Sequence, residues 1–315
     1  MKLLILGNGF DLAFGYWTSY SSFVNTVVGT TGSFWPFRYE PKGKFMLDCL
    51  HRHFFDFVIN QNGVGNVRWI DIEGELLNYA IKRSKDIVNS ELLEQDELSY
   101  ERLCQCLYQY LRAIYPDRRD SKVDLTVPIQ ILNAIKVNGQ FEKIYTFNYT
   151  DPSIILTQFA HFSEPEISKI NYVHGSLKNN NIVLGINEDK TVPLEYDFLF
   201  KCDKIAPNLL PNDLLKADEV IIYGLSFGTI DGIYFKPFLE RISTNIYPDK
   251  KPKLTFLTYD SDSEKFIRRS LRQMGLSREQ LNNSLELRII PVSEINYKDA
   301  VRHNYNEFIR SLELK

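Results

Sequence analysis

The sequence predicts an α/β fold in which a parallel sheet carries a helical insertion. Short apolar segments recur along the chain, which is typical of strands covered on both faces of a sheet. Most of them are followed by a turn or a helical pattern, as in repeated β–α units. The expected strands are Lys2–Leu6, Lys143–Phe147, Asn171–Val173, Ile182–Leu184, Glu219–Tyr223, Leu254–Thr258 and Leu287–Ile290.

A block of helical patterns interrupts this alternation. The block contains helical patterns over Trp69–Val88, Glu97–Tyr115 and Thr126–Lys136. We therefore expect residues 1–33 and 138–315 to form a sheet-containing core, and residues 34–137 to form a helical insertion. Other helices are expected where apolar residues recur at three- and four-residue intervals from Phe10 to Val27, after a capping box at 261–264, and at the end of the chain.

Composition limits the function classes. The chain has 315 residues, of which 44% are hydrophobic and 24% charged, as in a folded soluble protein. Its net charge of −3 gives no basic surplus, which disfavours general nucleic-acid binding. No segment approaches the ~20 apolar residues of a membrane span. The four cysteines contain no CxxC pair, which disfavours a zinc ribbon or a disulfide framework. We expect a cytoplasmic protein without a metal.

The first candidate motif is the loop Gly7-Asn8-Gly9-Phe10-Asp11, directly after the first strand. Glycines at such a place let the backbone approach a phosphate, and the following helix offers free N–H groups. The dinucleotide fingerprint has a third glycine where this chain has Leu12. A tight strand-to-helix turn with Asp11 as the helix cap explains the loop equally well.

Asn148 directly follows another expected strand, Lys143–Phe147. Open α/β sheets bind ligands at the carboxyl ends of their strands. A side-chain amide there can orient a ribose hydroxyl or a water, because it both donates and accepts hydrogen bonds. The alternative is a structural turn over 148–151, with Pro152 starting a helix.

His174 is followed by Gly175 at the end of a third strand. An imidazole at a strand end is well placed for general-base catalysis near neutral pH. A lone histidine is more often a packed or hydrogen-bonded structural residue, and that alternative stays open.

A second glycine–serine turn covers Gly224-Leu225-Ser226-Phe227-Gly228. Gly224 and Ser226 are expected to contact a ribose or phosphate, while Asp231 is explained either as a ligand contact or as a helix cap. The turn also fits the G-x-S-x-G nucleophile elbow. A serine hydrolase would need a later histidine, and only His303, in an expected helix, follows Ser226.

An acidic segment opens the helical block. Glu73 lies between two isoleucine-bearing turns and could face a cavity, while Asp71 and Glu75 favour a helix start. The alternative is a solvated acidic first turn.

Together these motifs resemble the AbiH family of bacterial abortive-infection proteins. The family pattern runs roughly GNGFDxxxGxxTxY, W-x-D-x-E, FNYT, HG and GHSxGxxD, and the chain follows it in order over about residues 1–235. Leu225 stands where the family usually has histidine. The matching residues are Gly7–Asp11, Gly15, Thr18, Tyr20, Trp69, Asp71, Glu73, Phe147–Thr150, His174-Gly175 and Gly224–Asp231.

AbiH proteins are in turn similar to sirtuins, which bind NAD through a GAG loop, an N-x-D motif, a His-Gly base and a later G-x-S turn. Those places are taken here by Gly7-Asn8-Gly9, Asn148, His174 and Gly224-Leu225-Ser226. Thr150 replaces the sirtuin aspartate, and the deacylase zinc ribbon is absent. The resemblance implies a sirtuin-like Rossmann core that acts in phage defence.

What the resemblance implies chemically is hydrolysis of the nicotinamide–ribose bond of NAD, through an oxocarbenium-like state. Asn148 would orient ribose or water, His174 would accept a proton, and Asp11 or Glu73 would stabilise positive charge. The expected NAD-binding residues are Gly7, Asn8, Gly9, Phe10, Thr146, Gly224, Ser226 and Asp231.

Two other function classes remain open at this point. One is a sensing or scaffolding module that binds a dinucleotide without turnover, which the replacements Leu225 and Thr150 favour. The other is a nuclease or other effector that works with a partner. The expected partners are a small-molecule dinucleotide, a phage-derived trigger or a partner protein, and a second copy of the chain; no membrane contact is expected.

Overall fold

The computed structural model describes residues 1–23, 71–83, 90–138, 141–188, 191–202, 204, 208–244 and 251–313. The chain divides into two compact units, which are described separately. The sheet unit comprises Met1–Gly15, Asp120–Val173 and Pro207–Lys315, and the helical unit comprises Tyr16–Arg119 and His174–Ala206. Residues 174–206, which the sequence analysis assigned to the core, thus cluster with the helical unit. The expected boundary at residue 33 lies outside the described residues.

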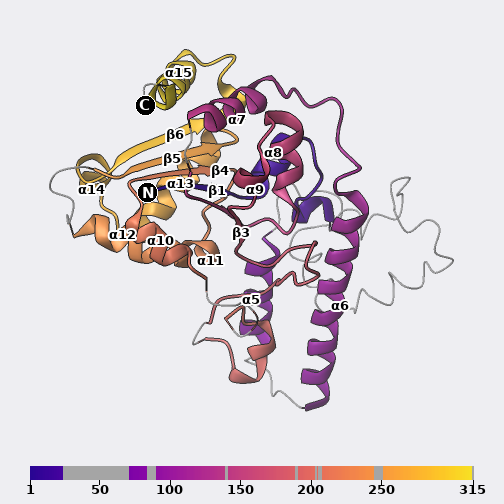
Figure 1. Cartoon of the computed structure of the whole chain (residues 1–315). Helices are drawn as coiled ribbons and strands as arrows, with labels where there is room; N and C mark the ends of the chain where they lie inside the picture. Colours follow the sequence, from indigo (N-terminus) through magenta and orange to yellow (C-terminus); the bar gives the residue numbers. More distant parts are fainter. Residues whose placement is uncertain are drawn as a thin grey trace. The chain divides into compact units, whose positions relative to one another are not determined.

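The sheet unit contains a six-stranded, all-parallel sheet (Figure 1). Its strand order is β3-β2-β1-β4-β5-β6, so the order reverses between β1 and β4, as in doubly wound nucleotide-binding folds. The α/β prediction is confirmed. The strands are β1 (Lys2–Leu6), β2 (Lys143–Thr146), β3 (Ile170–Tyr172), β4 (Glu219–Tyr223), β5 (Lys253–Thr258) and β6 (Glu286–Pro291).

Helices cover both faces of this sheet, which explains why its strands are apolar on both sides. Figure 1 shows α10 and α12 on one side and α7 and α15 on the other. The helices of the sheet unit are α1 (Asn8–Ala13), α7 (Thr126–Asn138), α8 (Pro152–Ala160), α9 (Glu164–Ile167), α10 (Leu210–Lys216), α11 (Thr229–Gly232), α12 (Lys236–Ser243), α13 (Ser261–Gln273), α14 (Arg278–Asn283), α15 (Asp299–Glu313) and the 3-10 turns η2 (Ile233–Phe235) and η3 (Val292–Glu294).

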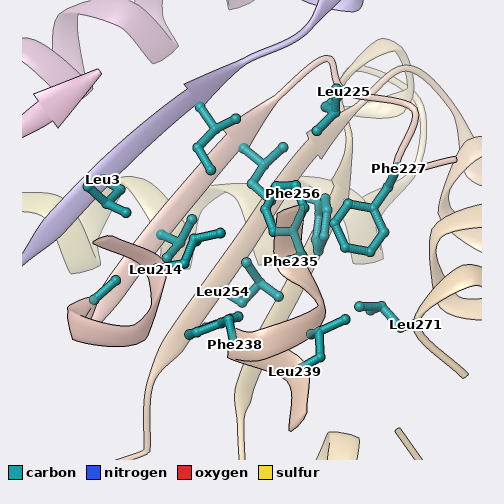
Figure 2. Packing of buried hydrophobic residues seen from close by; sticks show 14 of the residues in the cluster. Leu3, Leu214, Leu225, Phe227, Phe235, Phe238, Leu239, Leu254, Phe256 and Leu271 are labelled. Atoms are coloured by element: carbon teal, nitrogen blue, oxygen red, sulfur yellow. The ribbon is translucent and has the colours of Figure 1, made fainter. Parts of the chain in front are cut away.

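A buried apolar cluster fills one side of the sheet (Figure 2). Alternate residues of each strand contribute to it, such as Leu3 and Ile5 of β1, because successive side chains point to opposite faces. Helices α10 and α12 supply Leu214 and Phe238 from outside the sheet. Two residues of the loop after β4, Leu225 and Phe227, also belong to this cluster.

Three local expectations were wrong. The expected continuous helix from Phe10 to Val27 ends at Ala13, because Gly15 adopts a left-handed φ of 83°; Val24 and Val27 lie outside the described residues. The expected strand Ile182–Leu184 is a loop. The capping box that was placed at Ser261–Glu264 is replaced by Asp260, whose carboxylate accepts a hydrogen bond from the Ser263 N–H at 2.8 Å.

The helical unit contains α5 (Ile72–Arg83), α6 (Ser90–Ile114) and the 3-10 segment η1 (Leu194–Leu199). These elements are joined around the buried carboxylate of Asp96 on α6. Asp96 accepts hydrogen bonds from the Tyr79 and Tyr196 hydroxyls, both at 2.6 Å, and from Arg83 Nε at 3.0 Å. Burial, followed by the hydrogen bond to Asp96, raises the pKa of both tyrosines far above the usual range, so they stay protonated donors.

Candidate functional site

The loops after β1, β2 and β4 begin at the same edge of the sheet. In the register of the strands, Leu6 pairs with Thr146 of β2 and with Tyr223 of β4. The carboxyl ends of these strands are therefore level, and Gly7, Asn148 and Gly224 all follow at that edge. This edge, at the reversal of strand order, is where doubly wound sheets bind their ligands.

The first and the last of these loops are joined by their backbones. Gly7 N–H donates to Tyr223 O at 2.9 Å, and Gly9 N–H donates to Gly224 O at 2.7 Å. A Cβ at Gly9 would lie 2.7 Å from Gly224 Cα, and one at Gly7 would lie 2.5 Å from Leu225 Cα. Loop-to-loop contact is thus sufficient reason for glycine at both positions, whatever ligand binds there.

Of Gly7, Gly9 and Gly224, Gly224 has the least room for a side chain. Its φ is +72°, and a Cβ there would lie 2.1 Å from the Phe10 backbone nitrogen. Phe10 itself is buried, with its ring 5.4 Å from the Tyr223 ring, so its side chain belongs to the packing of the sheet unit. Asn8, the remaining predicted loop residue, is half-buried.

Asp11, Asn148 and Thr150 form a hydrogen-bonded group at the same edge. All three side chains are buried. Asn148 Nδ2 donates to Asp11 Oδ1 at 3.0 Å, and Thr150 Oγ1 donates to Asp11 Oδ2 at 2.5 Å. Asp11 lies inside α1, whose N-cap is Gly7, so the alternative of Asp11 as the helix cap was wrong.

The two polar atoms of the Asn148 side chain differ in their hydrogen bonding. Its Nδ2 also donates to Gly7 O at 3.1 Å, and its backbone N–H donates to Thr146 Oγ1 at 3.1 Å. Its carbonyl oxygen Oδ1 is buried and has no hydrogen-bond partner among the described residues. The turn alternative for this segment holds for Asp151, which caps α8 through a bond from Ser153 N–H, but not for Thr150.

Side chains of the loop after β4 are alternately buried and exposed. Leu225 and Phe227 are buried and point into the apolar cluster, as Figure 2 shows, while Ser226 is exposed. Phe227 has a φ of +55°, a conformation that is rare for a bulky residue. Asp231 follows in the first turn of α11, whose N-cap is Gly228.

The helical unit contains a second cluster of predicted residues. Glu73 is buried on α5 and forms an ion pair with the buried Lys201, at an Nζ–Oε1 distance of 2.7 Å. The solvated alternative for Glu73 was therefore wrong. Burial, and secondarily the charge of Lys201, lowers the pKa of His174 well below its usual 6.5. His174 is therefore neutral at neutral pH, the form that accepts a proton.

In the helical unit, Lys201 was not predicted from the sequence, and the role of Gly175 was predicted only in part. Lys201 was missed because no local pattern pairs it with Glu73, which lies far away in the sequence. Gly175 was read only as the neighbour of His174. It has a φ of +77°, and a Cβ there would lie 1.8 Å from Asn181 O, so it is required by the turn that brings Val183 N–H to His174 O.

A family profile described as "Bacteriophage abortive infection AbiH" matches residues 3–247. The chain belongs to the AbiH family. This family is one of bacteriophage abortive infection, which supports an anti-phage role for the chain. A search of curated proteins finds no significant match.

The residues of the AbiH motifs are divided between the two units. The glycine loop, Asn148 and the turn at Gly224 share one sheet edge, while Glu73 and His174 lie in the helical unit; Trp69 lies outside the described residues. Leu225, at the position of the family histidine, is 6% exposed in the apolar cluster. The serine-hydrolase alternative gains no support, because the His303 imidazole contacts Glu307 on its own helix.

Across the described ranges, no group of three or more His, Cys, Asp or Glu side chains is arranged to hold a metal ion. None of the helices in those ranges is long and apolar enough to cross a membrane.

Proposed function

We propose that this AbiH protein binds NAD and hydrolyses its nicotinamide–ribose bond as its part in phage defence. The observation that carries the proposal is the buried carbonyl oxygen of Asn148, without a partner among the described residues, at the sheet edge where doubly wound folds bind dinucleotides. Buried polar atoms without a partner are rare in folded proteins, and a catalytic role is one known reason for them.

In the proposed reaction, the bond between ribose C1′ and the nicotinamide nitrogen breaks, and its electron pair leaves with neutral nicotinamide. A water oxygen bonds to C1′, and the proton that it loses goes to the neutral imidazole of His174. Asn148 orients the sugar or the water. The products are ADP-ribose, nicotinamide and one proton.

Asp11 and Glu73, the two carboxylates predicted from the sequence to stabilise positive charge, are less suited to that task. The Glu73 carboxylate is already paired with Lys201, and Asp11 is fully buried and accepts hydrogen bonds from Asn148 and Thr150. This observation favours a second candidate, a sensor that binds NAD without turnover. The two candidates share the binding site and differ only in the chemical step.

The test is incubation of the purified full chain with NAD, with and without a lysate of phage-infected cells, while NAD and nicotinamide are measured. We expect nicotinamide to appear with the wild type and to fall at least 100-fold in Asn148→Ala and His174→Ala. His303→Gln, on the exposed side of α15, is the matched histidine control. Undiminished NAD in every sample contradicts hydrolysis, and calorimetric binding without turnover then selects the sensor.

A further inference from the structure

We propose that Asp11 and Thr150 are positioning residues that fix the Asn148 side-chain amide so that its carbonyl oxygen accepts a hydrogen bond from a sugar hydroxyl of the ligand. The identity of the ligand rests on the proposed function. The positioning of the amide rests on the hydrogen bonds alone, and it is tested separately.

The two ends of the Asn148 side-chain amide have different neighbours. Asn148 Nδ2 lies between two acceptors, Gly7 O at 3.1 Å and Asp11 Oδ1 at 3.0 Å. If the amide turned by 180°, its oxygen would face a carbonyl and a carboxylate, neither of which can donate. Only one orientation is therefore compatible with its neighbours, and in that orientation Oδ1 points away from Asp11.

Thr150 holds the Asp11 carboxylate in place. Its other oxygen, Oδ2, accepts a hydrogen bond from the Thr150 hydroxyl at 2.5 Å. Each carboxylate oxygen thus has one side-chain donor, and the side chain is fully buried. Thr150, which replaces an aspartate of the sirtuin motif, has a defined task here: it donates to Asp11.

The orientation of the Asn148 amide determines which part of a ligand can bind to it. The fixed amide leaves Oδ1 of Asn148 as a buried acceptor with no donor among the described residues. Such an atom selects a hydrogen-bond donor and disfavours phosphate oxygens, which only accept. The part of a dinucleotide that suits this position is therefore a ribose hydroxyl rather than the pyrophosphate. Asp11 acts in this scheme through Asn148 and does not touch the ligand.

The positioning is tested by NMR of the ligand-free full chain with ¹⁵N-labelled asparagine, using Asn148→Ala to assign the Asn148 amide signals. Asp11→Asn keeps an acceptor oxygen for Asn148 while its new NH₂ group donates to Thr150. In Asp11→Asn/Thr150→Val this NH₂ group has no such acceptor and can turn toward Asn148, so that neither orientation of the Asn148 amide then has suitable partners at both residue 11 and Gly7 O. We expect the double variant to exchange its Asn148 amide protons at least 10-fold faster than either single variant.

Asp213→Asn is the matched control, because Asp213 is also buried and accepts from Tyr145 and Lys143, at the start of β2. It should leave the Asn148 signals unchanged. Equal exchange rates in the double variant, the single variants and the wild type would overturn the positioning role, whether or not NAD is cleaved.

The acceptor role is tested by calorimetry with NAD and with analogues that lack the 2′- or the 3′-hydroxyl of the nicotinamide ribose. We expect the wild type to bind one analogue about 10-fold more weakly than NAD, and Asn148→Ala to lose that preference. Equal binding of all three ligands by the wild type overturns the acceptor role. Absence of NAD binding contradicts both this role and the proposed function, while the NMR result still decides on positioning.

Discussion

The ammonium group of Lys201 lies 2.7 Å from the Glu73 carboxylate, and both side chains are buried. Breaking a buried ion pair leaves one charge without its counter-charge, at a cost of about 3–5 kcal/mol. We expect Lys201→Met to lower the free energy of unfolding by about this amount in urea titrations. Glu73→Leu/Lys201→Met should cost less than Lys201→Met alone. Lys265→Met, which breaks an exposed ion pair with Asp262, should leave stability unchanged.

The lowered pKa of His174 makes stability depend on pH. Because the folded state holds the imidazole neutral, the unfolded chain binds a proton first as the pH falls below about 6.5. The stability that His174 contributes is complete above that pH and is lost as the pH falls toward the lowered folded pKa. Over this window, the wild type should lose up to ~1.4 kcal/mol per pH unit more than His174→Gln. Urea unfolding between pH 7.5 and 5.5 measures the difference, and parallel profiles would contradict it.

The contact between the loops at Gly9 and Gly224 separates two explanations of the glycine motif. If loop packing requires these glycines, Gly224→Ala destabilises the protein by about 3 kcal/mol or more, because φ is +72° and Phe10 N lies 2.1 Å from the new Cβ. Gly228→Ala is the matched control, since nothing lies within 4 Å of a Cβ there. If the glycines served only a ligand, Gly224→Ala would unfold like the wild type and lose only NAD binding.

Tyr79 and Tyr196 both donate to Asp96, and we expect their substitutions to have coupled effects on stability. Tyr79→Phe and Tyr196→Phe each remove one hydrogen bond to a buried carboxylate, which costs about 1.5–3 kcal/mol. Because both hydroxyls contact Asp96, their effects should not add in the double variant. A double-mutant cycle by urea unfolding measures the coupling, and strictly additive values would show that the two bonds are independent.

The strands of the sheet were predictable because burial on both faces gives continuous apolar runs. Lys2–Leu6 and Glu219–Tyr223 were predicted with the bounds that the structure has. Ile182–Leu184 has the same composition but is a loop, since a short apolar run alone does not distinguish a strand from a buried connection. The helix after β1 was overextended because its apolar spacing continues past Gly15, where the backbone turns.

The site was predictable as a set of motifs but not as a set of contacts. Asp11 and Asn148 were both named from the sequence, yet their hydrogen bond joins residues far apart in the chain, and nothing local indicates it. Lys201 and the role of Thr150 were missed for the same reason: each depends on a distant partner. Glu73 was a candidate, but its burial depends on a counter-charge that sequence spacing does not reveal.

The position of β1 also affects the order in which the protein is assembled. This first strand pairs with β2 and β4, and the turn that follows it donates its Gly7 and Gly9 N–H groups to Tyr223 and Gly224. Because β1 is synthesised before β2 and β4, its edges and its turn lack these partners until residues beyond 220 have been made. Contacts so distant in sequence slow folding and leave intermediates exposed to aggregation. An anti-phage protein built in this way becomes complete only late in its own synthesis.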